Sequence, residues 1–265
     1  MTPHMKSNDL ARAARRKILV STHSAKASHV GSALSVVDIL AVLYAKVANI
    51  SPTNSTAIDR DRIIFSKGHA ASALYSVLEL TGFVPAGSMD KFCLDGSSFG
   101  GHVTHTGKSG VELSTGSLGH GLPYGLGVAL GLRQIGLSAK VFVVVSDGEC
   151  NEGTTWESAL IANQFELQNL VVVVDRNRIQ SLGHTEAIMK LEPLAEKWRS
   201  FGWEVRTIDG HSHSEIEEAL QNQVGPLCVI ANTVKGKGVS FMEDQVSWHY
   251  KSVNDAELAT ALGEI

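Results

Sequence analysis

Polar residues follow two strongly apolar runs, at a spacing that could bring them to one point of the folded chain. Asp147 comes just after residues 141–145, and Asn177, thirty residues further on, follows residues 170–174. The carboxyl ends of neighbouring parallel strands lie at one edge of a sheet, where open α/β sheets bind ligands. A carboxylate and an amide oxygen together suit Mg²⁺, which usually takes phosphate and water as further ligands. The sequence therefore predicts a metal-bridged diphosphate at this edge.

Each part of this pattern is ordinary by itself. An Asp-Gly pair after a strand, such as Asp147-Gly148, is commonly only a turn. The pattern becomes restrictive when both parts occur in one strand–helix–strand unit with Glu152, Trp156 and Glu157 between them. We therefore interpret the whole unit, and not its separate parts, as a binding site.

The segments that must position these residues alternate between helical patterns and short β-branched runs. Near-continuous apolar runs are typical of strands that are buried on both faces of a parallel sheet. The expected strands are residues 63–65, 141–145, 170–174, 203–208 and 227–233. The expected helices are residues 9–26, 35–48, 70–80, 122–132, 154–168 and 214–223. This alternation predicts an α/β fold, a doubly wound and mostly parallel sheet with helices on both faces, in a single domain over residues 1–265.

Composition limits the class of protein. Among 265 residues, Lys and Arg number 23 and Asp and Glu 27, so the formal charge of −4 argues against a nucleic-acid binder. The three cysteines form no CxxC pair, so neither a disulfide framework nor a zinc ribbon is expected. We also expect no apolar run close to the roughly 18 residues of a membrane span and no secretory leader. These features predict a cytoplasmic protein that binds neither nucleic acid nor membrane.

The residues of the strand–helix–strand unit resemble a known family. Residues 141–180 are similar to the thiamine diphosphate signature, and their details resemble its transketolase version. The residues that carry this resemblance are Glu152-Gly153 with Trp156-Glu157, Asn169-Leu170, and Asp175 with Asn177 and Gln180. Other elements of the family resemble residues 28–31, 66–70, 101–102, 114–119 and 248–249. The resemblance covers about residues 29–249 and implies the thiamine diphosphate-binding fold.

The resemblance implies a set of ligands for this cofactor. Asp147, Asn177 and the backbone carbonyl of Ile179 would hold Mg²⁺ or Ca²⁺. The diphosphate group of thiamine diphosphate would bind beside the metal ion. The cofactor-binding residues implied besides these are His69, Gly116, Leu118, Gly148, Glu149 and His249.

The resemblance also implies which residues move protons. Imidazole titrates near neutral pH and often serves as a general acid or base. His29, His69 and His102 would face the thiazolium ring of the cofactor and the hydroxyl groups of a sugar. Glu152 would belong to an acidic network that links the two halves of the active site.

Several residues depart from the family pattern. Ser146 stands where the signature begins with glycine, and Val30 stands where proline usually follows His29. His120 occupies a position that is often glutamine, and its role stays open. Tyr250 follows His249 where glycine is common.

Two further signals are weak. The Lys-Gly-Lys-Gly sequence at residues 235–238 could cradle a phosphate, but such a sequence is more often a solvated turn. His211 and His213 lie in a turn-like context outside the matched elements, and we interpret them as solvated or capping residues.

The activity implied by the resemblance is transfer of a two-carbon ketol unit from a ketose or its phosphate to an aldose or its phosphate. Family members need a second domain, which supplies a glutamate and an aromatic platform for the aminopyrimidine ring of the cofactor. The chain ends at Ile265, directly after the diphosphate-binding type of domain. We therefore expect the N-terminal subunit of a transketolase that is active only with a partner chain, with two copies of each chain in the assembly.

Two alternatives remain open at this stage. One is a component of another thiamine diphosphate enzyme, similar to deoxyxylulose-phosphate synthase or to the first component of a 2-oxo acid dehydrogenase. Trp156 and the three sugar-facing histidines speak against this alternative. The other is a catalytically inert module that binds the cofactor and yields no activity with any partner.

Overall fold

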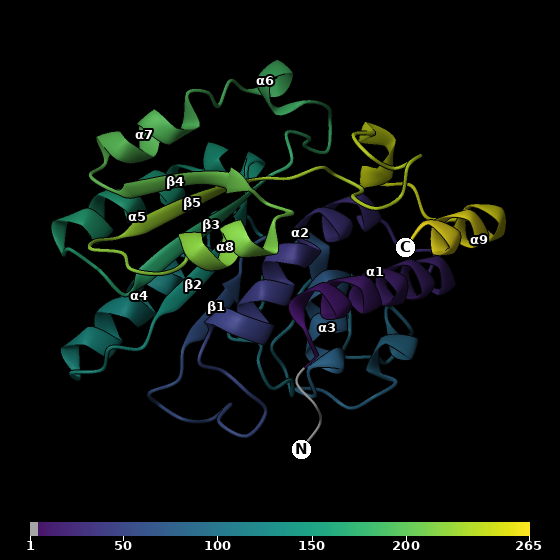
Figure 1. Cartoon of the computed structure of the whole chain (residues 1–265), viewed down its shortest axis with the longest axis horizontal. Helices are drawn as coiled ribbons and strands as arrows, with labels where there is room; N and C mark the ends of the chain where they lie inside the picture. The colour runs from purple at the N-terminus through teal and green to yellow at the C-terminus, as the bar shows by residue number, and fades with distance from the viewer. Residues whose placement is uncertain (1–4) are drawn as a thin grey trace.

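A wholly parallel sheet forms the centre of the molecule. The computed structural model describes residues 5–265. The strands lie in the order β1-β2-β3-β5-β4 (Figure 1). Their bounds are β1 Arg62–Phe65, β2 Val141–Ser146, β3 Leu170–Arg176, β4 Glu204–Asp209 and β5 Leu227–Asn232. The predicted α/β class is confirmed, and the expected strands agree with those found to within a few residues at their ends.

Strand register brings the carboxyl ends of the strands level with one another. In the β2–β3 pair, Val141 lies opposite Leu170 and Ser146 opposite Asp175. The next residue of the chain after β2 is Asp147, so the loops after these two strands start side by side. This register is well specified because β2 and β3 are buried along their whole length, and their side chains pack on both faces of the sheet.

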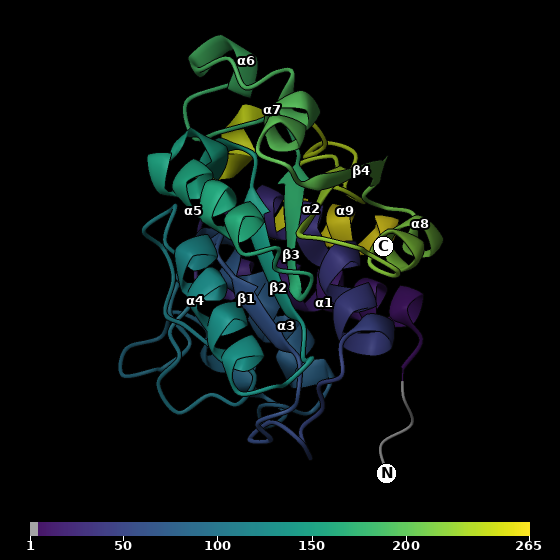
Figure 2. The same ribbon diagram turned by 90° about the vertical axis from the view of Figure 1, so that its left-hand side faces the viewer.

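Helices cover both faces of the sheet, as Figure 2 shows. The helices on one face are α1 Ser7–Ser24, α2 Val30–Val42, α3 Ala71–Leu80 and α8 His213–Ala219. Those on the other face are α4 Gly121–Gln134, α5 Gly153–Gln164 and α7 Leu194–Ser200. The short helix α6 Thr185–Ile188 follows β3, and α9 Asp255–Glu264 lies beside α1.

Alternate residues of each strand enter two separate hydrophobic cores. On β2, Val144 packs with α1, α2 and α3, whereas Val143 packs with α4 and α5. On β3, Val171 belongs to the same core as Val144, and Val172 belongs to the same core as Val143. The sheet is therefore held from both sides, and its carboxyl edge is left to loops.

The expectation that no apolar run comes close to the length of a membrane span was wrong. Residues Val30–Val47, which comprise α2 and the π-helical turn Leu43–Val47, form a helical stretch of 18 residues with a mean hydropathy of 1.8. By length and composition alone, this stretch could cross a membrane. In the structure 83% of it is buried inside the molecule, as in the core helix of a globular protein. Figure 1 shows α2 packed between the sheet and α1.

Helix ends differ more from expectation than strand ends do. Helix α2 begins at Val30 and not at Ser35, because the left-handed backbone of His29 (φ 69°) turns the chain into the helix and its carbonyl accepts from the Ala33 amide at 3.0 Å. Helix α8 ends at Ala219, four residues early. Three helices were not expected: α6, α7 and α9.

Candidate functional site

The predicted ligand residues lie at the carboxyl edge of the sheet. His69 follows β1 in the 3₁₀ turn Gly68–Ala70, Asp147 follows β2, and Asn177 follows β3. Lys235 follows β5, the neighbour of β3. Four strand ends therefore contribute to one region of the molecule.

Asp147 has a buried carboxylate that is already ordered by backbone donors. Its Oδ1 accepts from the Gly148 amide at 2.7 Å, and its Oδ2 accepts from the Arg178 amide at 2.6 Å. The guanidinium of Arg176 lies 3.3 Å from Oδ2. Burial and the nearby charge of Asp175 raise the pKa of Asp147, while these donors and Arg176 oppose the rise. A divalent cation would relieve this unfavourable environment of the carboxylate.

Asn177 is oriented by its neighbours. Its Nδ2 donates to Asp175 Oδ2 and to Ser35 Oγ, each at 3.3 Å. Its Oδ1 accepts from the Ile179 amide at 3.1 Å and keeps a second lone pair. The turn after β3 thus holds the side-chain oxygen of Asn177 and the backbone of Ile179 in fixed positions.

Asp175 is the fully buried anchor of this turn. It accepts from Ser35 Oγ at 2.6 Å and also from Lys67 Nζ and Thr233 Oγ1. Burial alone would raise the pKa of Asp175, but Lys67 and the hydroxyl donors outweigh it and hold the pKa below its ordinary value. Since Asp175 is charged and saturated with donors, its role is to fix Asn177 and not to bind a ligand.

The donor set fits the predicted metal ion. One carboxylate, one amide oxygen and one backbone carbonyl are the oxygen ligands that Mg²⁺ and Ca²⁺ take in proteins. Within residues 5–265 no group of three His, Cys, Asp or Glu side chains forms a metal cluster. Within the described residues, the oxygens of Asp147, Asn177 and Ile179 are therefore the set that matches the predicted Mg²⁺ or Ca²⁺ site.

Lys235 joins this turn to a histidine. Its ammonium group is fully buried and donates to the Ile179 carbonyl at 3.2 Å and to His249 Nδ1 at 2.8 Å. Burial and the charge of Lys67 lower the pKa of Lys235 to about 8, so it is charged at neutral pH. An ammonium group can only donate. His249 Nδ1 is therefore the acceptor, and the proton of the neutral ring lies on Nε2.

Four histidines gather beside Lys235. The ring centroid of His29 lies 5.5 Å from that of His69, 5.6 Å from that of His102 and 5.0 Å from that of His249. The rings of His69 and His249 are stacked at 6.0 Å. The structure thus brings together all four histidines that the sequence assigned to the cofactor and substrate.

The imidazoles of His29, His69 and His249 are neutral in the protein as it stands. Burial, followed by the charges of His102 and Lys235, lowers the pKa of His29 to about 4. Burial and Lys235 lower the pKa of His249 to about 3. Burial, with Lys67 as the largest charge, also lowers the pKa of His69. Neutral rings can accept protons, and a nearby anion would raise their pKa values towards neutrality.

The glycine-containing loop at residues 116–120 and the segment after β2 complete the surroundings of the histidine cluster. A Cβ atom on Gly116 would lie 3.0 Å from His102 Cδ2, so glycine allows this loop to approach the histidines. Gly116 and His120 line a hollow of about 660 Å³. Leu118 is half-buried in the same loop, and Gly148 is half-buried at the end of β2.

The two predicted glutamates occupy different environments. Glu149 is fully buried and accepts from the Gly119 amide at 2.9 Å, the Ser146 amide at 3.3 Å and the Ser66 hydroxyl. Burial raises the pKa of Glu149. Glu152 is exposed just before α5, and its side chain lies against Gly119. The cofactor-binding role of Glu149 and the network role of Glu152 stay predictions.

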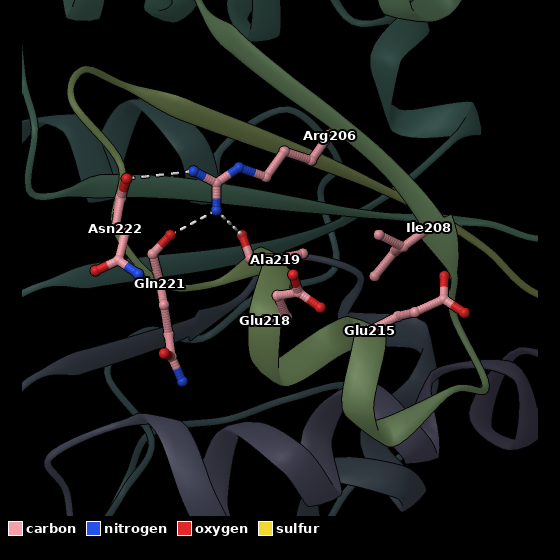
Figure 3. A pocket seen from close by; sticks show the side chains of 7 residues that line it. All are labelled: Arg206, Ile208, Glu215, Glu218, Ala219, Gln221 and Asn222. Atoms are coloured by element: carbon pink, nitrogen blue, oxygen red, sulfur yellow. Dashed lines mark hydrogen bonds between the residues drawn. The ribbon is translucent and has the colours of Figure 1, made fainter.

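Another hollow, of about 390 Å³, lies away from this region, against β4 and the end of α8 (Figure 3). Its cation, Arg206, already donates to the carbonyls of Ala219, Gln221 and Asn222. The guanidinium also pairs with Glu204. With these donors satisfied, the hollow offers no group suited to the predicted chemistry.

Sequence reasoning missed part of the site. It treats Lys235 as part of a Gly-Lys turn that could cradle a phosphate but is more often solvated, and it gives Lys67 and Asp175 no role beyond their motifs. The signal that could have found them is position, because each lies at or just after the carboxyl end of a strand of the sheet. A polar residue at such an end is ordinary by itself, so the signal is that several of them occur at the same edge, as for Asp147 and Asn177.

Comparisons with known proteins agree with this geometry. A family model described as "Transketolase, thiamine diphosphate binding domain" matches residues 7–263. The chain is 39% identical over 259 residues to one of the subunits of the apulose-4-phosphate transketolase of Actinobacillus succinogenes, covering 96% of this chain and 94% of that protein. It is 37% identical over 241 residues to a 6-deoxy-6-sulfo-D-fructose transketolase subunit of Clostridium sp. (strain MSTE9), covering 89% and 88%.

The chain is also similar to solved structures of transketolases. Transketolase from Campylobacter jejuni matches with a TM-score of 0.88 and 27% identity over 97% of this chain. Transketolase from Leishmania mexicana matches with a TM-score of 0.91 at 23% identity and so shows the fold alone. In both cases the chain spans 41% of the longer protein.

Proposed function

The chain belongs to the transketolase family as its thiamine diphosphate-binding domain, and from this membership we propose that it is the cofactor-binding subunit of a two-chain transketolase. Two relatives named as transketolase subunits match over 94% and 88% of their length. Transketolases of known structure are much longer, since the chain spans 41% of them. A partner chain would supply the remainder of such an enzyme.

One observation carries the proposal. The oxygens of Asp147, Asn177 and Ile179 lie at the end of the sheet, and Lys235 links that turn directly to the histidine cluster. A diphosphate bound to a metal ion at Asp147 would therefore end beside His249. The same ligand, extended towards His29 and His102, would bring its reactive end among the imidazoles of the histidine cluster.

The chain's own residues have distinct parts in this reaction. Asp147, Asn177 and the Ile179 carbonyl would hold Mg²⁺ or Ca²⁺, and Nε2 of His249 would donate to a phosphate oxygen. When bound, thiamine diphosphate supplies a nucleophilic carbon and an electron sink for cleavage of a carbon–carbon bond. His29, His69 and His102 would accept and return protons at the sugar hydroxyls. The low pKa of His29 keeps its ring in the accepting form.

The substrates we propose are a ketose or ketose phosphate as donor and an aldose or aldose phosphate as acceptor. The two relatives are named for apulose 4-phosphate and 6-deoxy-6-sulfo-D-fructose. The substituents that these names print, a 4-phosphate and a 6-sulfo group, lie away from the first two carbon atoms, which are the ones that a transketolase transfers. A common ketol-transfer site in this chain, with the remote end contacted mainly by the partner, accounts for that range. An assembly with two copies of each chain and a cytoplasmic location stay predictions.

The direct test is reconstitution. The chain is co-purified with its partner chain, loaded with thiamine diphosphate and Mg²⁺, and given a ketose donor with an aldose acceptor. We expect the acceptor to gain two carbon atoms only when both chains are present. Release of CO₂ from pyruvate would instead assign a decarboxylating enzyme, and cofactor binding without any turnover would assign an inert module.

A further inference from the structure

A buried carboxylate outside the site contacts two histidines that the sequence analysis interprets as solvated or capping residues. Asp38, on α2, accepts from Arg15 of α1 at 3.0 and 2.5 Å. It also contacts His211 Nδ1 at 2.7 Å and His213 Nε2 at 3.1 Å. The side chains of His211 and His213 are only 14% and 11% exposed. Burial alone would raise the pKa of Asp38, but donors from His211, His213 and Arg15 outweigh it and lower the pKa.

The two histidines differ in what their second ring nitrogen contacts. His211 Nε2 accepts from the Val234 amide at 2.9 Å. Because an accepting nitrogen carries no proton, the proton of His211 lies on Nδ1, which donates it to Asp38. His213 Nδ1 instead contacts the Ser7 hydroxyl at 2.8 Å, at the start of α1. Of the two, His211 therefore connects Asp38 to the chain after β5.

Val234 directly precedes Lys235, so this contact reaches the site. The segment 234–238 is also held by other contacts: the Asp244 amide donates to the Lys235 carbonyl at 2.9 Å, Gly236 donates to the Gly31 carbonyl at 2.9 Å, and Arg15 Nε donates to the Lys237 carbonyl at 3.2 Å. His211 holds the amide of the residue directly before Lys235. From there Lys235 reaches the Ile179 carbonyl and His249 Nδ1.

We propose that His211 is a positioning residue of the cofactor site, which holds Lys235 against Ile179 and His249 through its hydrogen bond to the Val234 amide. The inference rests on the proposed function, since it names the bound group as the metal-complexed diphosphate. His211 does not touch the ligand. It acts by keeping the backbone of Lys235 in the one position from which the ammonium meets both acceptors.

Two substitutions separate the two hydrogen bonds of His211. In His211→Asn, the amide nitrogen takes the place of Nδ1 and keeps the bond to Asp38, but the side chain is too short to reach Val234. In His211→Gln, the amide oxygen takes the place of Nε2 and keeps the bond to Val234. We expect the Asn variant to bind thiamine diphosphate with Mg²⁺ about 10-fold more weakly, the size of effect known for residues that support metal ligands. The Gln variant should bind like the unchanged chain.

His213→Asn is the matched control. It removes a hydrogen bond from the same carboxylate, keeps the contact with Ser7 and leaves segment 234–238 untouched. Affinities are measured by calorimetry on the complex with the partner chain. Equal weakening in His211→Asn and His213→Asn, or unchanged affinity in His211→Asn, would overturn the inference. Should His211→Asn fail to fold, weakened binding by His211→Gln would overturn it instead.

Hydrogen exchange gives a second readout that needs no ligand. Exchange of the amides at residues 234–238 should be faster in His211→Asn than in His213→Asn or the unchanged chain, and equal exchange rates would contradict the proposed link. If the unchanged complex binds no thiamine diphosphate, the proposed function fails and the inference fails with it. If it binds and the variants do not differ, only the inference fails.

Discussion

At the scale of single residues, the site is organised by fixed donors and acceptors. Lys235 can only donate, so it determines which nitrogen of His249 is available to a ligand. Asp175 plays the same part for Asn177, because it binds the amide nitrogen and leaves the oxygen outward. These residues contribute geometry, while Asp147 contributes the charge that a metal ion would meet.

Replacement of Asp147 by Asn tests that charge. The single amide oxygen of Asn can accept from one of the two amides that Asp147 binds, those of Gly148 and Arg178, and the negative charge is lost. We expect the metal-dependent affinity for thiamine diphosphate to fall by at least the roughly 10–100-fold that loss of a supporting residue causes. Calorimetry with and without Mg²⁺ measures this, with Asp95→Asn, an exposed site, as the control. Unchanged affinity in Asp147→Asn would exclude Asp147 as a ligand.

The histidine cluster predicts how stability depends on pH. His29 and His249 have pKa values of about 4 and about 3, below those of unfolded imidazoles near 6.5. As the pH falls below about 6.5, the unfolded chain therefore binds protons first. Their contribution to stability is complete above that pH and is lost as the pH falls towards 4.

Urea unfolding of the full chain at about pH 7 and about pH 5 measures this contribution. The fall in the free energy of unfolding should be smaller in His29→Asn, by on the order of 1 kcal/mol after allowance for partial exposure. His184→Asn, an exposed histidine outside the cluster, controls for loss of an imidazole. A pH dependence that is the same in His29→Asn and the unchanged chain would contradict the burial argument.

At the scale of elements, α4 shows how glycine sets the distance between a helix and the sheet. A Cβ atom on Gly125 would lie 2.5 Å from Val143 Cγ2 and 3.1 Å from Ile64 Cδ1, so the helix backbone packs directly on β2 and β1. Gly131, on the same helix, faces open space. The close approach matters for the site because α4 begins at Gly121, directly after the glycine loop that includes Gly116 and Gly119.

The two helical glycines, Gly125 and Gly131, give an internally controlled prediction. Gly125→Ala should destabilise the chain by roughly 1–3 kcal/mol, because the added methyl group forces the helix away from the sheet. Gly131→Ala should be neutral or stabilise by up to about 1 kcal/mol, because alanine favours the helix. Thermal or urea unfolding of both variants measures the difference. Equal effects would mean that α4 does not pack as closely as described.

The elements also show what sequence could and could not predict. Strands β2, β3 and β5 were predicted because buried parallel strands are near-continuous apolar runs, such as residues 170–174, whereas the edge strand β4 is partly exposed and mixes polar with apolar residues. Helices α7 and α9 were missed, although neither is shorter than α8, which was predicted. Helix α9 still carries a readable signal, since Asn254 and Glu257 form a capping box whose side chains satisfy each other's amides.

The site was predictable only where motifs and strand ends coincide. Asp147 and Asn177 could be paired from spacing, and the resemblance added the histidines. The partners of Lys235 and of His211 could not be inferred, because each contact joins segments far apart in the chain. The two atoms of the His211–Val234 contact, for example, come from the turn before α8 and from the loop after β5.

At the scale of the whole molecule, two cores of unequal size hold the sheet. The larger core includes most of α2, whose residues Val30–Val42 are all buried. This explains why a stretch with the composition of a membrane span occurs in a globular fold. The helix is buried on every side because α1, α3, α8 and the sheet surround it.

Shortening a side chain of α2 within this core should therefore destabilise the fold strongly. Leu40→Ala on α2 is expected to lower the free energy of unfolding by roughly 2–5 kcal/mol, the range for large-to-small changes in cores. Leu160→Ala on α5, where the side chain is 60% exposed, should change stability by at most about 0.5 kcal/mol. Urea unfolding compares the two variants. A small effect of Leu40→Ala would contradict the placement of α2 at the centre of the core.

The buried carboxylate of Glu149 has a consequence for how quickly the enzyme could be loaded. It joins its own turn at the end of β2, through Ser146, to Ser66 after β1 and to Gly119 in the glycine loop, so this wall is formed before any small molecule binds. A preorganised wall loses little entropy when a ligand docks on it. Loading should therefore be limited by diffusional encounter rather than by slow ordering of these loops, and cofactor exchange should leave their backbone unchanged.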